Sequence, residues 1–308
     1  MKPTVLVISP AVPAVVRERL AARFEVLGPV SASDLPALLR RDGARIVGIL
    51  ARGGDPLDRP AIALLPALRA VACISAGTEG IDAGALAERG IAFSTTASVL
   101  AEDVADLAIA LMLMVRRRLV EADGFVRRGA WPDGSFPLGR AARGRRLGLL
   151  GFGGIGQAIA RRGEAMGMHL RYCATRPKPC CPLPFLPTPR DLAADSDVLV
   201  VCCPGGPATQ GLVSAEVIAA LGPEGVLVNV ARGEVVDEDA LIAALASGRL
   251  AGAGLDVYRR EPHVDARLRQ APNVVLTPHL GSGTQETRAA MADHALAALQ
   301  HALVPPDL

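Results

Sequence analysis

Short apolar runs, many of them rich in β-branched residues, alternate with stretches of helical spacing along most of the chain. This alternation is the pattern of repeated β–α units. Four runs in the first third predict strands, at Thr4–Ser9, Ile46–Leu50, Val71–Ser75 and Ile91–Phe93. The stretches between them predict helices, at Ala14–Ala22, Leu35–Arg41, Ala61–Leu65 and Ala83–Glu88.

The alternation restarts after a long helical region that runs from Ala101 to about Arg128. Two sets of β–α units favour two α/β domains, each a doubly wound parallel sheet with helices on both faces. A last helix, Thr284–Leu303, is expected to return to the first domain. We therefore predict a discontinuous domain of residues 1–98 and 281–308, and a second domain of residues 99–280. The strands of the second set are predicted at Arg146–Leu150, His169–Cys173, Val198–Cys202, Val226–Val230, Gly252–Leu255 and Val274–Thr277.

The composition is that of a globular protein with a large core, since half of the 308 residues are apolar. The formal net charge of +2 is too small to indicate nucleic acid or an anionic membrane as a partner. The apolar segment Leu107–Val115 is too short to span a membrane, and prolines interrupt the apolar N-terminus, which favours a strand over a signal peptide. The six cysteines show no zinc-like spacing, so we expect no metal site, and reduced thiols in a cytoplasmic protein.

One glycine-rich run stands between a predicted strand and a predicted helix. It reads Gly151-Phe152-Gly153-Gly154-Ile155-Gly156, and the helix continues to Met166. Strand, G-x-G-x-x-G and helix in this order are typical of a dinucleotide site. The glycines allow a tight turn, close approach of the backbone to a pyrophosphate and close packing of helix on strand, and the helix N-terminus attracts phosphates. The sequence therefore predicts two Rossmann-like doubly wound domains, of which the second binds a dinucleotide.

Four polar residues follow predicted strands of the second domain: Arg232, Asp256, Glu261 and His279. Ligands of open parallel sheets bind outside the carboxyl ends of the strands, so these side chains are expected to converge there. Carbonyl reduction needs a cation to grip an acid group, a proton donor, and a carboxylate to orient that donor. Taken singly, each residue also has an ordinary interpretation as a surface ion pair, a solvated carboxylate or a capped loop residue.

Five separate motifs point to one family. They are Gly77-Thr78-Glu79-Gly80-Ile81-Asp82, Gly151 to Gly156, Asn229-Val230-Ala231-Arg232-Gly233, Gly254-Leu255-Asp256-Val257 through Glu261-Pro262, and Thr277-Pro278-His279-Leu280-Gly281-Ser282. With these motifs the chain resembles the D-isomer-specific 2-hydroxyacid dehydrogenase family over nearly its whole length. The run from Val99 to Ala110 and the segment Phe136–Gly139 are most similar to the glyoxylate/hydroxypyruvate reductase branch.

The resemblance implies an active site in the cleft between the two domains, with catalytic roles for Arg232, Glu261 and His279. Arg232 would bind the substrate carboxylate and polarise the keto oxygen, for which a forked and permanently charged guanidinium is suited. Protonated His279 would donate a proton to that oxygen. Glu261 would hydrogen-bond the other imidazole nitrogen and favour the imidazolium.

The resemblance also implies binding residues. Backbone N–H groups of Ala76, Gly77 and Thr78 would help to hold the substrate carboxylate. Arg52 is expected either as a further substrate contact or as a solvated loop cation, and Asp256 would contact the nicotinamide amide. The remaining cofactor contacts are expected at Val99, Gly151, Gly153, Gly154, Ile155, Gly156, Thr175, Arg176, Pro204, Thr209, Val230 and Ala231.

The segment after the second strand of the dinucleotide domain bears on the choice of cofactor. A ribose-binding Asp or Glu is expected about twenty residues beyond the glycines, but Ala174-Thr175-Arg176-Pro177-Lys178 contains no acid. A carboxylate would repel a 2′-phosphate, whereas Arg176 and Lys178 would attract it and Thr175 could donate a hydrogen bond. The sequence therefore predicts NADPH as the preferred cofactor, with NADH weaker.

The implied reaction is the reduction of a small 2-keto acid, of the glyoxylate or hydroxypyruvate type, to the D-2-hydroxy acid. Two alternatives remain open: the same chemistry on a bulkier acid such as phenylpyruvate or 2-ketogluconate, and a non-catalytic dinucleotide-sensing protein. The complete Arg, Glu and His set argues against the sensor. The family also implies a homodimer through the dinucleotide domains, with Leu107–Val115 and the segment around Trp131 either at that interface or packed within one subunit.

Overall fold

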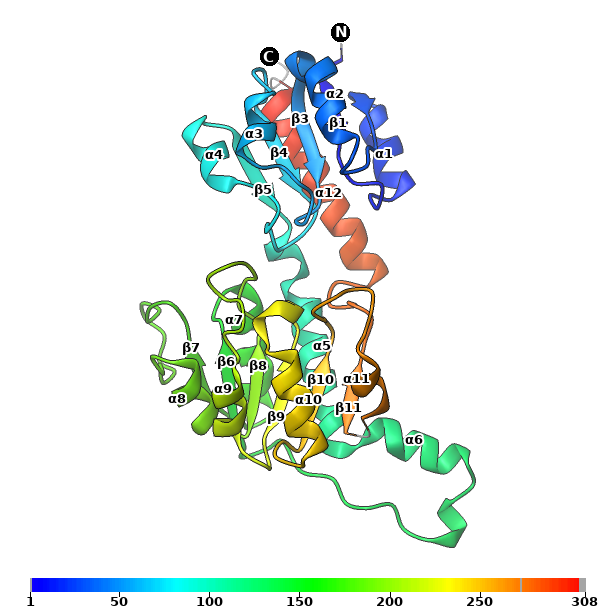
Figure 1. Ribbon diagram of the computed structural model, residues 1–308, viewed down its shortest axis with the longest axis vertical. Helices are drawn as coiled ribbons and strands as arrows, with labels where there is room; N and C mark the ends of the chain where they lie inside the picture. The colour runs from blue at the N-terminus through cyan, green and yellow to red at the C-terminus, as the bar shows by residue number, and fades with distance from the viewer. Residues whose placement is uncertain (1, 272, 305–308) are drawn as a thin grey trace. The chain divides into compact units, whose positions relative to one another are not determined.

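The computed structural model describes residues 2–271 and 273–304, which fall into two compact units. Unit 1 is Met1–Leu100 with Thr284–Leu308, and unit 2 is Ala101–Gly283. Each unit is built on one parallel sheet with helices on both faces, so the predicted fold class is confirmed (Figure 1). No helix among the described residues is both long and apolar enough to cross a lipid bilayer.

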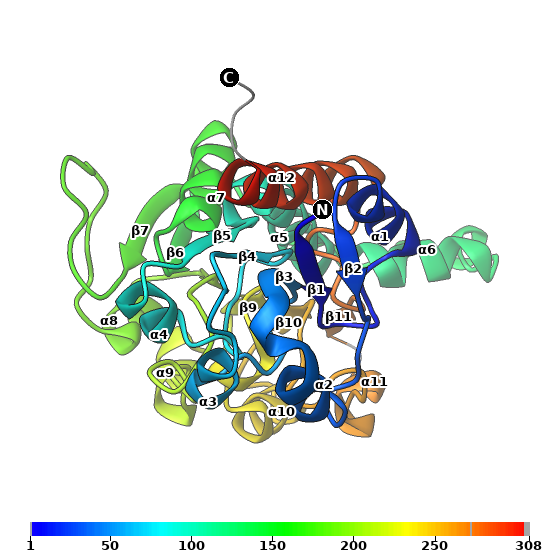
Figure 2. The ribbon, with the colours of Figure 1, turned by 90° about the horizontal axis from the view of Figure 1, so that it is seen from above.

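Unit 1 has a five-stranded parallel sheet in the order β2-β1-β3-β4-β5. One face is covered by α1 (Ala14–Ala21) and by the C-terminal helix α12 (Gln285–Leu303), which lies against β3, β4 and β5 (Figure 2). The other face is covered by α2 (Leu35–Asp42), α3 (Arg59–Ala63) and α4 (Ala83–Glu88). The strands are β1 (Thr4–Val7), β2 (Glu25–Leu27), β3 (Ile46–Ala51), β4 (Ala70–Cys73) and β5 (Ala92–Thr95).

The strand β2 was not predicted from the sequence. It has three residues, lies at the edge of the sheet and contains no fully buried side chain. A run this short, with Glu25 among its residues, carries neither the apolar length nor the alternation that identifies a strand. Pairing with β1 therefore decides its conformation.

Unit 2 has a six-stranded parallel sheet in the order β11-β10-β9-β8-β6-β7. Its strands are β6 (Arg146–Leu150), β7 (His169–Cys173), β8 (Val198–Val201), β9 (Val226–Asn229), β10 (Gly252–Leu255) and β11 (Val274–Leu276). One face is covered by α8 (Pro189–Ala194), α9 (Ala215–Leu221), α10 (Glu238–Ala246) and α11 (Ala266–Gln270). The helix α7 (Gly154–Ala165) packs on β6 and β7. Short 3-10 helices occur at Gly43–Arg45, Trp131–Asp133 and Gly233–Val235.

The helical region expected between Ala101 and about Arg128 is divided into α5 (Ala97–Arg117) and α6 (Leu119–Arg127). Arg118 separates them with a φ of 54°, in the left-handed region that no helix interior can accommodate. The local sequence contains no glycine or proline at this point, so the break has no signal in the pattern. The helix α5 packs so closely on β10 that a Cβ at Gly254 would lie 2.8 Å from the Cβ of Leu111.

The strands of unit 2 end at one level, and this positions the candidate site. The register pairs Leu150 with Cys173 on one side and with Val201 on the other, and it continues through Asn229 to the last two strands. All these strands are parallel, but β7 is added on one side of β6 and β8 on the other, so the carboxyl ends of β6 and β8 form the switch point at which open α/β sheets bind ligands. The complete row of paired residues is Cys173, Leu150, Val201, Asn229, Leu255 and Leu276.

Candidate active site

The glycine run lies directly after this row, between β6 and α7. Gly151 has a φ of 103°, and a Cβ there would lie 2.6 Å from the backbone nitrogen of Cys203. A Cβ at Gly156 would lie 2.5 Å from the carbonyl oxygen of Gly151, so this residue gives the close helix–strand contact. Gly153, in contrast, has no neighbouring atom within 4 Å of its Cβ position, and no side chain caps the helix that begins after it. An open glycine beside an uncapped helix N-terminus fits the diphosphate of a dinucleotide.

The other cofactor candidates of unit 2 follow neighbouring strands. Thr209 donates its hydroxyl to the carbonyl oxygen of Pro204 at 2.8 Å, which closes the loop after β8. Val230 and Ala231 follow β9 and are buried. Val99 lies in the first turn of α5, and that turn belongs to unit 1.

His279 and Glu261 form a hydrogen-bonded pair. The imidazole Nδ1 lies 2.7 Å from Oε2 of Glu261, and Oε1 of the same carboxylate accepts the backbone N–H of Tyr258 at 3.1 Å. Both carboxylate oxygens are therefore fixed, and the carboxylate in turn orients the ring. With a proton held on Nδ1, the nitrogen that can exchange a proton outside the pair is Nε2.

The electrostatics of Glu261 bring Arg232 into the same cluster. Burial acts to raise the pKa of Glu261, but the hydrogen bonds from His279 and Tyr258 and the charges of His279 and Arg232 outweigh it and lower that pKa. The carboxylate therefore stays ionised at neutral and mildly acidic pH, and its pairing with the imidazole is lost only as the pH falls through this lowered pKa.

A tight turn after β9 presents Arg232. The buried side chain of Asn229 spans this turn, accepting the N–H of Ala231 at 3.0 Å and donating to the carbonyl of Arg232 at 3.0 Å. The guanidinium Nη1 donates to the carbonyl of Ala231 at 2.7 Å. Gly233 then passes so close to Tyr258 that a Cβ would lie 1.9 Å from its carbonyl carbon. Asn229 is a positioning residue for which no role was predicted, although it begins the motif Asn229–Gly233.

Asp256 is 1 % exposed, and its carboxylate holds the segment that carries His279. It accepts the hydroxyl of Thr277 at 2.6 Å, the N–H of Leu280 at 2.7 Å and the N–H of Gly281 at 2.8 Å. His279 lies between these anchors with a φ of 55°, and its own N–H donates to the carbonyl of Asp256 at 2.9 Å. The expected contact of Asp256 with a nicotinamide amide remains a prediction.

Tyr258 also holds the segment that carries His279. Its hydroxyl donates to the carbonyl oxygens of Leu255 and Thr277, at 3.1 Å and 2.9 Å. Burial and the nearby charge of Asp256 raise the pKa of Tyr258 to about 12, so the phenol stays protonated and keeps donating. No role was predicted for this tyrosine, which follows Asp256 by two residues and carries the N–H that binds Glu261.

The loop after β7 is cationic at its exposed positions. Thr175, Arg176 and Lys178 are all exposed, and the first carboxylate after the strand is that of Asp191 in α8. Neither Arg176 nor Lys178 forms an ion pair with any described residue. The side chains predicted to bind a 2′-phosphate are therefore accessible.

The substrate candidates of unit 1 lie in two loops that contact each other, after β3 and β4. Gly80 donates its N–H to the carbonyl of Gly53 at 2.7 Å, and a Cβ at Gly53 would lie 2.0 Å from the carbonyl oxygen of Gly77. The N–H groups of Ala76, Gly77 and Thr78 donate to no other residue in the described part of the chain. Three successive N–H groups without protein acceptors fit an anion such as a carboxylate. Arg52 is exposed at the end of β3.

No group of three or more metal-ligating side chains occurs among residues 2–271 and 273–304. All six cysteines are free thiols.

Comparison with known proteins gives concordant matches. Residues 109–281 match the model of the D-isomer specific 2-hydroxyacid dehydrogenase NAD binding domain. A glyoxylate/hydroxypyruvate reductase of Arabidopsis thaliana is 44% identical over 89% of this chain and 88% of its own length. A 2-ketogluconate reductase of Gluconobacter oxydans is 40% identical over 95% of this chain and 93% of its own. The crystal structure of an NADPH-dependent glyoxylate/hydroxypyruvate reductase of Sinorhizobium meliloti, in complex with NADP and malonate, has a TM-score of 0.88 and 40% identity over 98% and 95% of the two chains.

Proposed function

The chain belongs to the D-isomer specific 2-hydroxyacid dehydrogenase family, and from this premise we propose that it reduces a small 2-keto acid to the D-2-hydroxy acid. The preferred substrates are of the glyoxylate or hydroxypyruvate type. The observation that carries the proposal is the His279–Glu261 pair at 2.7 Å, with the charge of Arg232 acting on the same carboxylate. A proton donor, its orienting carboxylate and a cation are the three groups that carbonyl reduction requires.

In this reaction three residues of unit 2 have separate roles. Arg232 binds the carboxylate of the substrate and draws electron density toward the keto oxygen. His279 delivers the proton from Nε2 to that oxygen as the carbonyl bond becomes a C–O–H group. Glu261 keeps the ring oriented and compensates the positive charge that the imidazole carries before the transfer. A bound nicotinamide dinucleotide supplies the hydride that reduces the keto carbon.

We assign the substrate candidates of unit 1 to the binding of the anionic group. The N–H groups of Ala76, Gly77 and Thr78 would donate to a carboxylate, and Arg52 would add a positive charge at the end of β3. This assignment is supported by the absence of other acceptors for these three N–H groups among the described residues.

The preferred cofactor under this proposal is NADPH, with NADH weaker. The support is the exposed Arg176 and Lys178 after β7 and the lack of a carboxylate before Asp191, where an NAD-specific site would place one against the 2′-hydroxyl. The NADP complex of the Sinorhizobium meliloti relative points in the same direction.

Turnover tests the proposal. The purified protein is mixed with NADPH or NADH, and absorbance at about 340 nm is followed with glyoxylate, hydroxypyruvate, pyruvate, phenylpyruvate and 2-ketogluconate. We expect the highest kcat/KM with glyoxylate or hydroxypyruvate, and a value at least about tenfold higher with NADPH than with NADH, since a charge-assisted contact contributes about 1.5–3 kcal/mol. Dominant turnover of 2-ketogluconate or phenylpyruvate would reassign the substrate, and dinucleotide binding without any turnover would favour the sensing protein.

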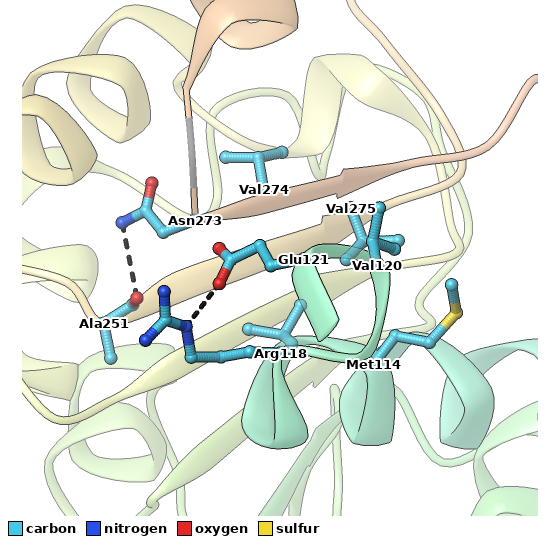
Figure 3. A pocket seen from close by; sticks show the side chains of 9 residues that line it. Met114, Arg118, Val120, Glu121, Ala251, Asn273, Val274 and Val275 are labelled. Carbon is cyan, nitrogen blue, oxygen red and sulfur yellow. Dashed lines mark hydrogen bonds and ion pairs between the residues drawn. The ribbon is translucent and has the colours of Figure 1, made fainter. Parts of the chain in front are cut away.

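We further propose that the protein forms a homodimer through an arm made of residues 119–139. The arm extends from the body of unit 2 (Figure 1). Its apolar side chains include Trp131, which is 68% exposed, and Leu138, which is 97% exposed. At its base a pocket opens beside the ion pair of Arg118 and Glu121, between the end of α5 and the edge strand β11 (Figure 3). Phe136 packs on Phe125 with ring centroids 5.5 Å apart, so the segment after Asp133 contacts α6. Exposed apolar side chains that lie close together on one segment are typical of an interface.

Sedimentation velocity tests the dimer. Replacing both Trp131 and Leu138 with serine is expected to convert a dimer to a monomer at micromolar concentration, because the apolar area that drives association is removed. The control is Leu64→Ser, which changes a 38% exposed leucine of unit 1. A monomeric wild-type protein, or a double variant that remains dimeric, would contradict the proposal.

The free state of all six cysteines supports a reducing, cytoplasmic location, which we propose on this ground.

A further inference from the structure

One buried tyrosine joins the two loops that the proposed function assigns to the dinucleotide. Tyr172, on β7, is 1% exposed, and its hydroxyl accepts the backbone N–H of Lys178 at 2.8 Å. Its ring stacks on Phe152 of the glycine run, with ring centroids 4.4 Å apart and an interplanar angle of 26°. The same side chain thus contacts the turn before α7 and the cationic loop after β7.

The cationic loop has few other attachments. Its far end returns to Tyr172, whose N–H donates to the carbonyl of Pro184 at 3.0 Å and whose carbonyl accepts the N–H of Leu186 at 2.8 Å. Phe185 also packs against the Tyr172 ring, with centroids 5.5 Å apart. Between the two ends of the loop, the backbone N–H of Lys178 is the group that binds the Tyr172 hydroxyl.

The hydrogen bond from Lys178 to the Tyr172 hydroxyl lies within the run that carries the two exposed cations. Lys178 belongs to the Arg176-Pro177-Lys178-Pro179 run, whose exposed cations are proposed to bind a 2′-phosphate. Its carbonyl also accepts the N–H of Cys181 at 3.3 Å, so it begins the turn that follows. Fixing its N–H therefore fixes the backbone that carries both cations, and the two prolines beside it limit the other conformations.

We propose that Tyr172 is a positioning residue for cofactor choice: its hydroxyl holds the cationic loop in the conformation that recognises the 2′-phosphate of NADPH. The inference rests on the proposed preference for NADPH. The hydroxyl acts through the backbone N–H of Lys178. Through its stacking on Phe152, the ring keeps the cationic loop at a fixed position relative to the glycine run. Loss of the hydroxyl leaves the stacked ring in place and frees only the cationic loop.

The test uses Tyr172→Phe, which keeps the ring and removes the hydroxyl. Isothermal titration calorimetry measures binding of 2′,5′-ADP, which carries the 2′-phosphate, and of 5′-AMP, which lacks it. We expect the affinity of the variant for 2′,5′-ADP to fall about fivefold while that for 5′-AMP changes less than about twofold, since one neutral hydrogen bond is lost. Arg176→Ala is the positive control for a lost phosphate contact, and should weaken 2′,5′-ADP binding by at least as much.

Phe185→Leu is the matched control for packing, because it loosens the ring contact and leaves the hydroxyl bond intact. A merely structural role of Tyr172 would lower Tm and weaken both nucleotides alike. Equal weakening of both nucleotides in Tyr172→Phe, or no change in either, would overturn the inference. A wild-type protein that binds 2′,5′-ADP no more tightly than 5′-AMP would instead refute the proposed preference for NADPH, and the role of Tyr172 with it.

Discussion

Replacing His279 with asparagine is expected to lower kcat by about 10²–10⁴-fold, the usual contribution of a positioned general acid. Asparagine is chosen because His279 has a φ of 55°, a conformation that asparagine tolerates better than alanine does. Asparagine has no group that can deliver a proton to the keto oxygen. The side chain of His279 is 48% exposed, so its replacement should leave Tm nearly unchanged. Steady-state kinetics with NADPH and the best 2-keto acid measure the effect.

The control for this variant is His169→Asn, which changes an exposed histidine at the start of β7. It should retain wild-type kcat. NADPH binding, followed by fluorescence, should be the same in both variants, because neither residue belongs to the proposed cofactor contacts. A loss of less than about tenfold in kcat for His279→Asn would exclude His279 as the general acid.

Replacing Arg232 with lysine is expected to lower kcat/KM by about 10²-fold or more. Lysine keeps the charge but cannot offer the forked pair of donors that fits a carboxylate. It also cannot reproduce the bond from Nη1 to the carbonyl of Ala231, which orients the guanidinium. Each charge-assisted hydrogen bond contributes about 1.5–3 kcal/mol, and about 1.4 kcal/mol corresponds to a factor of ten. Initial rates over a range of substrate concentrations measure this loss.

The comparison variant is Arg249→Lys, at an exposed arginine whose Nε donates to the hydroxyl of Ser247. We expect it to match the wild type. The dissociation constant for NADPH should be unaltered in Arg232→Lys, which separates loss of substrate binding from loss of the cofactor. An unchanged kcat/KM in Arg232→Lys would mean that the forked geometry has no part in binding the substrate.

The elements that position the site could be predicted because their signals are local. Each core strand is an apolar run, and the glycine run carries its own conformational demand at Gly151 and Gly156. The family resemblance predicts that Glu261 hydrogen-bonds the imidazole of His279, and the structure places the two side chains 2.7 Å apart although they are 18 positions apart in the sequence. The fold class and the family followed from such signals.

The remaining features depend on contacts that no local pattern contains. Arg118 ends α5 in a left-handed conformation within a run of arginines. The uses of Asp256 and Tyr258 rest on bonds to Thr277 and Leu280, some twenty residues further along the chain. A sequence shows that a buried carboxylate follows a strand, but only the packed loops show which N–H groups it binds.

Because the strands of unit 2 all end at one row of paired residues, the loops that follow them are structurally separable from the sheet. The segment after β7 leaves the sheet at Cys173 and is tied back at Tyr172 through Pro184 and Leu186, so it is a closed module with fixed attachment points. A loop of different length or charge from an NAD-dependent relative could be grafted between these points without shifting the register of β6, β7 and β8. Under the proposed role of Arg176 and Lys178, such a graft would exchange the preferred cofactor without altering the residues that carry out the reduction.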